Sequence, residues 1–370
     1  MRDREPPDHG LGDARGGSAA QVNGETRPAA STSGPDDGSR MLSPARYLAW
    51  IYSPVPRQPV LAKLCEIESE VATSLRPGID HHVAHARLQW WQEECERCVQ
   101  GRPVHPLTRE LVKAFGAPAA GQPSPLAGLS GFVDTAVWDL AGATFETRKE
   151  LAAYCERWAA AMFETAALQV VRSASGEQAA AAAHVAAAAQ AASAAAGAHS
   201  TDAPQVASAA AGTHSTDAPQ VASAAARAPR AVSRWRALGA AVREIELLAD
   251  LAREAHAGRL RVPLDELEQA GVEVNSLAKP PWPAPLATLL RGRHEALRAT
   301  IGESLATFGR EEQPNFRGLF VWAALAWRQS ARVQRALPNI ILPRRYHALT
   351  DGWQAWRAAR RAAAGNLRLS

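Results

Sequence analysis

The sequence lacks the features that would place the protein in a membrane, on a secretory route or on a nucleic acid. No apolar run reaches the roughly 18 residues of a membrane-spanning helix. The first residues, MRDREPPDHG, contain no apolar segment typical of secretory signals. Lys and Arg number 41 against 37 Asp and Glu, a net charge of +4, without a basic block that would bind nucleic acid. We therefore expect a cytoplasmic protein with no nucleic-acid partner.

Cysteine is scarce, and the few thiols fit a reduced compartment. Cys95 and Cys98 form a single CxxC pair within a predicted helix, and no second pair accompanies it, so a zinc or redox centre is not indicated. His81 and His85 share a helix face, as metal ligands do, but no third ligand is identifiable. Surface or hydrogen-bonded core histidines are the favoured interpretation.

Large apolar side chains are nearly absent from two stretches, 1–40 and 173–232, which cannot bury enough surface to offset their ordering entropy. The second stretch contains a tandem duplication, GAHSTDAPQVASAAA from Gly197 and GTHSTDAPQVASAAA from Gly212. Two copies are too few for a solenoid, and we interpret them as an expanded surface linker. The expected organisation is a disordered tail (1–40), one all-α domain (41–172 and 233–349), a low-complexity insertion (173–232) and a basic C-terminal helix (350–370).

Outside these stretches the apolar residues recur at helical spacing, and Pro or Gly marks the joints. Period-two strand patterns of useful length are absent from the sequence. The predicted fold class is therefore all-α. The predicted helices are Val60 to Leu75, His81 to Gln100, Pro106 to Phe115, Arg148 to Val171, Arg234 to Ala257, Pro285 to Phe308, Phe316 to Ala336 and Thr350 to Ala364.

The last predicted helix combines Trp353 and Trp356 with several arginines. A basic helix with aromatic residues can rest on an anionic membrane surface. An ordinary solvated helix explains the same pattern. The sequence thus leaves open a peripheral contact with the inner face of a membrane.

An acidic residue lies on the apolar face of the helix predicted from Val60 to Leu75. At about 100° per residue, the apolar side chains gather around Glu68, whereas Glu66 and Glu70 point to the opposite side. An ionised carboxylate among apolar side chains is costly unless a cation, a metal or a proton compensates it. The alternatives are an ion pair with an arginine of a neighbouring helix, a place at the mouth of a cleft, or a metal site.

A second acidic set lies on the helix predicted from Arg234 to Ala257. Glu246, Asp250 and Glu254 recur every four residues and form one stripe beside Arg243, while apolar residues fill most of the remaining circumference. The stripe faces either water or a polar cavity. As a metal site it suits Mg²⁺, which prefers carboxylate oxygens and is often shared with substrate phosphates.

These carboxylates lie in segments that resemble the squalene/phytoene synthase family. The run LGAAVREIELLADLAREAHAGRLRVPLDELEQAGV from Leu238 is similar to a family segment that reads approximately LGxALQLTNILRDxxEDxxxGRxYLPxxxLxxxGV. Two further runs are similar to family segments in the same order, AHARLQWWQEECERCVQGRPVHPLTREL from Ala84 and FVDTAVWDLAGATFETRKELAAYCERWA from Phe132. The resemblance spans roughly 43–346 and is interrupted by the insertion.

The resemblance implies the isoprenoid synthase fold, a single all-α bundle around a central cavity. It also implies a transferase of isoprenoid biosynthesis, in which Mg²⁺ between the two acidic sets removes diphosphate from a C15 or C20 prenyl diphosphate, and the allyl cation couples head to head with a second molecule. No residue indicates whether NADPH is needed. The implied catalytic residues are Glu68, Asp250 and Glu254, and the implied Mg²⁺ ligands are Glu68, Glu246, Asp250 and Glu254. The implied substrate contacts are Arg87, Asp139, Tyr154 and Arg259. Candidates for an aromatic lining are Trp90, Trp91, Trp138 and Trp158, although ordinary core packing is the favoured interpretation of these tryptophans.

Several positions depart from the family pattern. Where members carry Asp-Asp-x-x-Asp on the first helix, this chain has Glu68, Ser69 and Ala72. Phe163 stands at a position that is small in the family and would narrow the cavity. On the second helix, Ala249 replaces an Arg of the family pattern and Arg253 replaces an acidic residue. In the turn that follows, Arg261 replaces the Tyr of the family's Tyr-Leu-Pro. These losses favour an alternative, a catalytically degenerate homologue that binds an isoprenoid lipid or assists assembly of respiratory complex I, as one branch of the family does.

Overall fold

The computed structural model describes residues 43–116, 124–170, 218–339 and 348–369, with the side chains of 218–232 and 348 excepted, and these residues form helices and turns without a strand. The expected all-α class is confirmed. The helices are α1 (Pro44–Tyr52), α2 (Gln58–Thr73), α3 (His81–Val99), α4 (Pro106–Phe115), α5 (Gly131–Leu140), α6 (Arg148–Ala159), α8 (Ala218–Ala249), α9 (Leu251–His256), α10 (Leu264–Gln269), α11 (Ala284–Ala306), α12 (Arg317–Ala336) and α13 (Ala348–Ala363).

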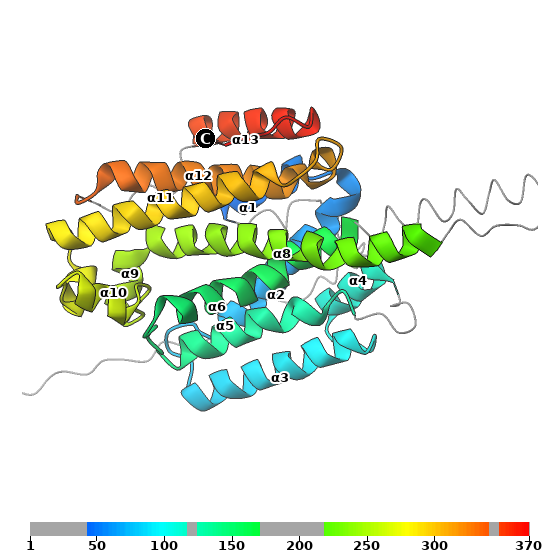
Figure 1. The fold of residues 1–370 in the computed structure, drawn as a ribbon. Helices are drawn as coiled ribbons and strands as arrows, with labels where there is room; N and C mark the ends of the chain where they lie inside the picture. The colour runs from blue at the N-terminus through cyan, green and yellow to red at the C-terminus, as the bar shows by residue number, and fades with distance from the viewer. Residues whose placement is uncertain (1–42, 117–123, 171–217, 340–347, 370) are drawn as a thin grey trace, which may run out of the picture. The chain divides into compact units, whose positions relative to one another are not determined.

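Helix α8 is the central element of the unit Gly38–Ser370. It packs against α6 on one side and against α11 and α12 on the other (Figure 1). Helices α1 and α13 pack on α12, and α3 packs against α4 and α5 at the opposite edge. Because α8 is surrounded by other helices, polar side chains on it must find partners inside the bundle.

The close approach of α6 and α8 depends on a glycine. A Cβ atom at Gly239 would lie 2.8 Å from the Cβ of Ala159 and 2.9 Å from that of Phe163, so a larger residue would push the helices apart. Beyond α6 the chain continues through a π-helical segment, Ala160–Glu164. The extra residue in a π-helical turn shifts the register of the side chains that follow.

Some helix boundaries differ from the prediction. Helices α1, α5 and α10 were not expected, and α10, with 6 residues, is too short to show a clear helical period. Helix α8 begins at Ala218, inside the stretch interpreted as a linker, because its alanine-rich sequence has high helix propensity. The predicted helix from Arg234 to Ala257 is broken at Asp250, which has φ −106° and ψ 9° and separates α8 from α9. The tail 1–40 and residues 173–217 lie outside the described residues.

The singled-out cysteines and histidines occupy separate places on α3. Cys95 and Cys98 are buried free thiols, and burial raises the pKa of both, well above its usual value for Cys95 and to about 11 for Cys98. The nitrogens Nε2 of His81 and Nε2 of His85 lie 3.1 Å apart on the exposed side. Both thiols are therefore protonated at neutral pH, and their reactivity is low.

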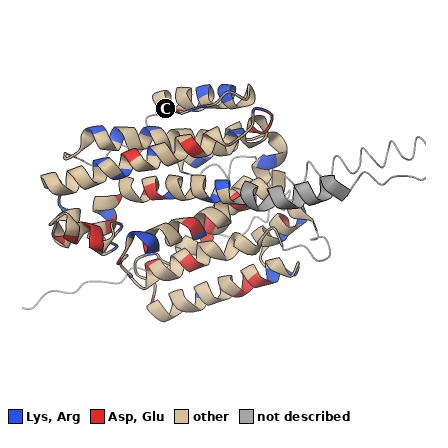
Figure 2. Cartoon of the chain, viewed as in Figure 1, with Lys and Arg blue, Asp and Glu red and all other residues tan. Residues whose placement is uncertain are grey.

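Charges of both signs are interspersed along the helices rather than segregated by sign (Figure 2). None of the helices in the described part of the chain is long and apolar enough to span a bilayer. Around α8, several acidic and basic side chains lie close together inside the bundle.

Candidate functional site

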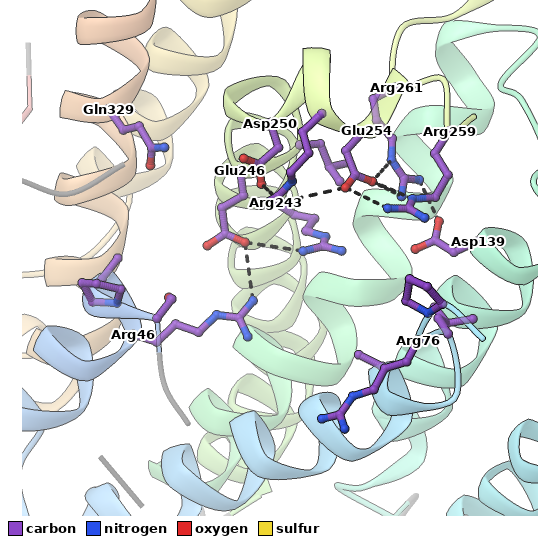
Figure 3. A pocket seen from close by; sticks show the side chains of 18 of the residues that line it. Arg46, Arg76, Asp139, Arg243, Glu246, Asp250, Glu254, Arg259, Arg261 and Gln329 are labelled. Carbon is purple, nitrogen blue, oxygen red and sulfur yellow. Dashed lines mark hydrogen bonds and ion pairs between the residues drawn. The ribbon is translucent and has the colours of Figure 1, made fainter. Parts of the chain in front are cut away.

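A cavity of about 730 Å³ opens where α8 meets α9 (Figure 3). Its walls come from the start of α1, the loop after α2, the end of α5, the α8 and α9 junction, and α12. Among the described residues that line it, the basic ones are Arg46, Arg76, Arg243, Arg253, Arg259, Arg261 and Arg332, and the acidic ones are Asp139, Glu246, Asp250, Glu254 and Asp351. Positive side chains therefore outnumber negative ones in this lining.

Arg46 of α1 links Glu68 of α2 to Glu246 of α8. Its Nη2 atom lies 3.1 Å from Oε1 of Glu68 and 3.5 Å from Oε2 of Glu246, and its Nη1 donates a second hydrogen bond to Glu68. Each carboxylate also accepts an indole hydrogen bond, from Trp158 to Glu68 at 2.7 Å and from Trp322 to Glu246 at 3.0 Å. The two half-buried carboxylates thus share the guanidinium of Arg46, and each accepts a hydrogen bond from an indole.

Charge and burial act in opposite directions on Glu68. Burial by itself would raise the pKa of this carboxyl, but the guanidinium groups of Arg46 and Arg243 and the hydrogen bonds hold it below its usual value. Glu68 is therefore ionised at neutral pH, and so is Arg46. The sequence left an ion pair with an arginine of a neighbouring helix as one alternative for Glu68, and the structure confirms that alternative.

Arg243 of α8 lies beside the same group with fewer contacts. Its Nη1 atom is 3.6 Å from Oε2 of Glu246, and its Nη2 donates to the hydroxyl of Tyr154 at 3.4 Å. Its Cζ atom lies 5.2 Å from the centre of the Trp158 ring. The Nε atom is buried and has no hydrogen-bond partner among the described residues. Arg243 therefore lines the cavity with a guanidinium whose Nη contacts are long and whose buried Nε lacks a partner among the described residues.

A second group of ion pairs surrounds Glu254 of α9. Arg259 donates to its carboxylate at 2.8 and 3.1 Å, and Arg261 donates at 3.0 and 3.3 Å. Arg261 also reaches Asp139 at 2.7 Å, and the hydroxyl of Tyr154 donates to Asp139 at 3.0 Å. Burial opposes ionisation of Glu254, but the two arginines outweigh it and lower its pKa to about 2. Glu254 is thus a fixed negative charge that orients two arginines.

Asp250 lies between these two groups, at the break between α8 and α9. Its carboxylate pairs with Arg253 at 2.6 Å. The expected single stripe of Glu246, Asp250 and Glu254 is therefore divided, because the helix is interrupted at the middle residue. Glu246 faces Arg46, whereas Glu254 faces the arginines of the following loop (Figure 3).

The structure brings together most of the predicted site residues. Asp139, Glu246, Asp250, Glu254 and Arg259 line the cavity, and Glu68 and Tyr154 are joined to it through hydrogen bonds. Arg87 is the exception: it lies on an exposed face of α3, outside the cavity, because the periodicity that buries Leu88 turns its neighbour outward. None of the four tryptophans proposed as lining residues is part of the wall, although Trp158 supports Glu68 from behind.

Sequence reasoning missed Arg46 and Trp322. Arg46 is the one charged residue in α1, PARYLAWIY, a composition that could have marked it as a buried cation. Trp322 is one of several aromatic residues in α12, and nothing in its local sequence distinguishes it from an ordinary core residue. Arg261, noted only as a departure from the family pattern, joins Glu254 to Asp139.

The residues present do not fit Mg²⁺. In the described parts of the chain, no group of three or more His, Cys, Asp or Glu side chains could hold a metal ion. Each predicted ligand is already engaged by an arginine: Glu68 and Glu246 by Arg46, Asp250 by Arg253, and Glu254 by Arg259. Mg²⁺ binds through carboxylate oxygens that are free to coordinate it, and here guanidinium groups occupy those oxygens.

The interior next to Glu68 is filled by aromatic rings. Trp158, Phe163 and Trp322 are all buried, and the centre of the Phe163 ring lies 6.1 Å from that of Trp158 and 5.1 Å from that of Trp322. Phe163 therefore fills space inside the bundle, as expected from its size. None of these three rings lines the open cavity described above.

Comparisons with known proteins agree with this architecture. The sequence model of the squalene/phytoene synthase family matches residues 43–351. A dehydrosqualene synthase crystallised in complex with a ligand has a similar structure, with a TM-score of 0.58 and 14% identity over 87% of this chain and 92% of the other. The squalene synthase HpnC from Alicyclobacillus acidocaldarius gives a TM-score of 0.51 and 14% identity over 80% and 90%. A search of curated proteins finds no match. The fold is that of the isoprenoid synthases, and the chain belongs to the squalene/phytoene synthase family.

Proposed function

We propose that this protein is a transferase that takes prenyl diphosphates into the cavity beside Asp250 and joins them head to head. The observation that carries the proposal is the lining of the cavity, an excess of arginine side chains in a fold shared with synthases of this type. Guanidinium groups match diphosphate in charge and in hydrogen-bond geometry. The substrate class follows from the family.

In the proposed reaction, the allylic carbon–oxygen bond of one substrate breaks and its electron pair leaves with the diphosphate. The double bond of the second substrate then supplies the electrons for the new carbon–carbon bond, and the coupled cation that results loses a proton. Arginines that are already held in position can stabilise the negative charge of the departing diphosphate without reorganisation. Arg259 and Arg261 are held in this way by Glu254.

A direct assay tests this proposal. The full-length protein is incubated with farnesyl or geranylgeranyl diphosphate, once with Mg²⁺ and once with excess EDTA, and the released pyrophosphate and extracted lipids are measured. We expect release of pyrophosphate together with a C30 or C40 product. Glu254→Ala, which removes the carboxylate that holds Arg259 and Arg261, should abolish release, whereas Asp134→Ala, which removes an exposed carboxylate of α5 outside the cavity, should not. No release with either substrate under either condition would contradict the proposal.

One observation favours a second function, the binding of an isoprenoid diphosphate without turnover. All four carboxylates that the family resemblance assigns to Mg²⁺ are engaged by arginines. Tight binding of farnesyl diphosphate to the protein, without release of pyrophosphate, would support this second function.

We also propose that α13 contacts a membrane surface peripherally. Leu349, Trp353 and Trp356 are exposed on its outer side. The Cζ atom of Arg357 lies 4.6 Å from the centre of the Trp353 ring, and that of Arg360 lies 5.0 Å from the centre of the Trp356 ring. Tryptophan rings accompanied by cations suit the interface between lipid headgroups and acyl chains. Such a contact would place the protein near its lipid substrate.

A further inference from the structure

The guanidinium of Arg46 stands between the two carboxylates that would have to share a divalent ion. Glu68 and Glu246 come from different helices, and both contact this one cation. Trp158 and Trp322 enclose it, with ring centres 5.7 and 5.2 Å from its Cζ atom. A metal ion could take this place only if Arg46 moved away and left a buried guanidinium without partners, which is costly.

Two further arginines at the cavity have hydrogen-bonding capacity to spare. Arg243 lines the cavity, and its Nη1 and Nη2 atoms make only long contacts, 3.6 Å to Glu246 and 3.4 Å to the hydroxyl of Tyr154. Arg76, in the loop after α2, is exposed and lines the cavity, and within the described part of the chain it forms no ion pair. In Figure 3, Arg76 and Arg243 lie on different walls of the same cavity. A ligand between them could accept hydrogen bonds from both.

We propose that this cavity binds a diphosphate group through arginine side chains without a divalent metal ion, with Arg46 as the fixed cation between Glu68 and Glu246. The inference rests on the proposed function, because it takes the diphosphate of a prenyl diphosphate as the ligand. It adds that arginine side chains, and not a divalent metal ion, neutralise the charge of the diphosphate.

The residues divide into two roles. Arg46 is a positioning residue, since both of its faces are occupied by protein carboxylates and tryptophans, and it keeps α1, α2 and α8 together. Arg76 and Arg243 contact the ligand, because both line the cavity, Arg76 forms no ion pair among the described residues, and the Nη atoms of Arg243 make only long contacts, at 3.4 and 3.6 Å. Arg259 is turned toward Glu254 and completes the positive wall.

Titration calorimetry with the full-length protein tests the inference. Inorganic pyrophosphate and farnesyl S-thiolodiphosphate, which resists ionisation, are titrated in excess EDTA and again in Mg²⁺ at matched concentrations of free ligand. We expect the Kd in EDTA to stay within about threefold of the Kd in Mg²⁺.

Variants identify the site of binding. Arg76→Ala removes an exposed arginine with no ion pair in the described residues, so folding should be unaffected, and we expect the affinity for pyrophosphate in EDTA to fall about tenfold. Arg243→Gln should reduce it by a similar factor. The matched control is Arg102→Ala, which removes an exposed arginine outside the cavity and should leave the affinity unchanged.

The outcomes separate this inference from the proposed function. Binding in EDTA that is weakened by Arg76→Ala but not by Arg102→Ala supports the inference. Binding only in Mg²⁺ overturns it and leaves the proposed function intact. Binding in EDTA that neither Arg76→Ala nor Arg243→Gln weakens places the ligand elsewhere and also overturns it. Binding of neither compound under either condition overturns both.

Discussion

Glu68 of α2 and Glu246 of α8 share a single cation, the guanidinium of Arg46. An ion shared between two helices is the arrangement expected of a metal in this family, but here a side chain of the protein supplies the charge. A guanidinium cannot dissociate as a metal ion can, and its hydrogen bonds are directional. The polar centre of the bundle is therefore assembled by folding alone.

Replacing Arg46 should uncover the repulsion between its two partners. We expect Arg46→Met to lower the free energy of unfolding by about 3–5 kcal/mol at pH 7, since one half of a buried ion pair is removed. Arg46 now helps to hold the pKa of Glu68 below its usual value. Without this guanidinium, the pKa should rise above that of the unfolded chain, so the variant gains stability as the pH falls from 7 toward 5.

Urea unfolding of the Arg46→Met variant at several pH values measures this effect. The control is Arg236→Met, which breaks an ion pair with Glu164 at 2.9 Å in which the arginine is largely exposed. That change should cost no more than about 1 kcal/mol, without the same pH dependence. Equal losses for the two variants would argue against a special role for Arg46.

Phe163 should limit the room for a long prenyl chain. We expect Phe163→Ala to lower the free energy of unfolding by about 3–5 kcal/mol, and to increase the affinity for farnesyl S-thiolodiphosphate relative to pyrophosphate, because the ring fills space beside Trp158. Phe320→Ala removes an equally buried ring that packs on Trp235 instead. It should match the stability loss without the gain in affinity. A gain in both variants would mean that looser packing, not the position of Phe163, admits the chain.

His294 should make stability depend on pH. Burial, with the charge of Arg298 nearby, lowers the pKa of His294 to about 4, and its Nδ1 atom lies 3.0 Å from Oγ of Ser330. As the pH falls through about 6.5, the imidazole of His294 becomes protonated in the unfolded chain but stays neutral in the folded protein. The free energy of unfolding therefore decreases between pH 6.5 and about 4. The loss should reach about 3 kcal/mol.

Unfolding curves measured from pH 7.5 to 4.5 test this prediction. His294→Leu should flatten the dependence in that window. His256→Ala removes an exposed imidazole and should keep the dependence of the unchanged protein. An unchanged slope in His294→Leu would assign the effect to another group.

The outer face of α13 should determine binding to vesicles. We expect the full-length protein to sediment with vesicles that contain phosphatidylserine more than with neutral ones, and the double change Trp353→Ala with Trp356→Ala to weaken this binding about tenfold. The matched control is Trp90→Ala on α3, another exposed tryptophan with an arginine, Arg97, 5.6 Å from its ring centre. Equal weakening by Trp90→Ala would contradict a role specific to α13.

Much of the fold could be predicted because helical periodicity is a local property. The expected helix from Pro106 to Phe115 agrees with α4 at both ends, where Pro106 begins the helix and Gly116, with φ 69°, ends it. Helix α12 agrees equally well at its end, Ala336. The break at Asp250 was not predictable in the same way, since the residues on either side continue one apolar pattern.

The candidate site was predictable only in part. An inward position for Glu68 follows from the spacing of its own helix, and a pairing with an arginine was one of the alternatives that its burial left open. Which arginine compensates it depends on how α1 packs across α2 and α8. Arg87 shows the reverse case, because its segment resembles the family but its side chain is exposed on α3.

By itself the sequence determined the helical class, the family and the inward carboxylates, because apolar periodicity and motif spacing are written along the chain. The tertiary structure alone decided what neutralises those carboxylates. Arg46 and Glu246 are far apart along the chain, and Trp322 lies on yet another helix. Whether a carboxylate meets a metal, a proton or a guanidinium is decided by the groups that packing brings within a few ångströms, since electrostatic compensation in a buried site is short-ranged and directional.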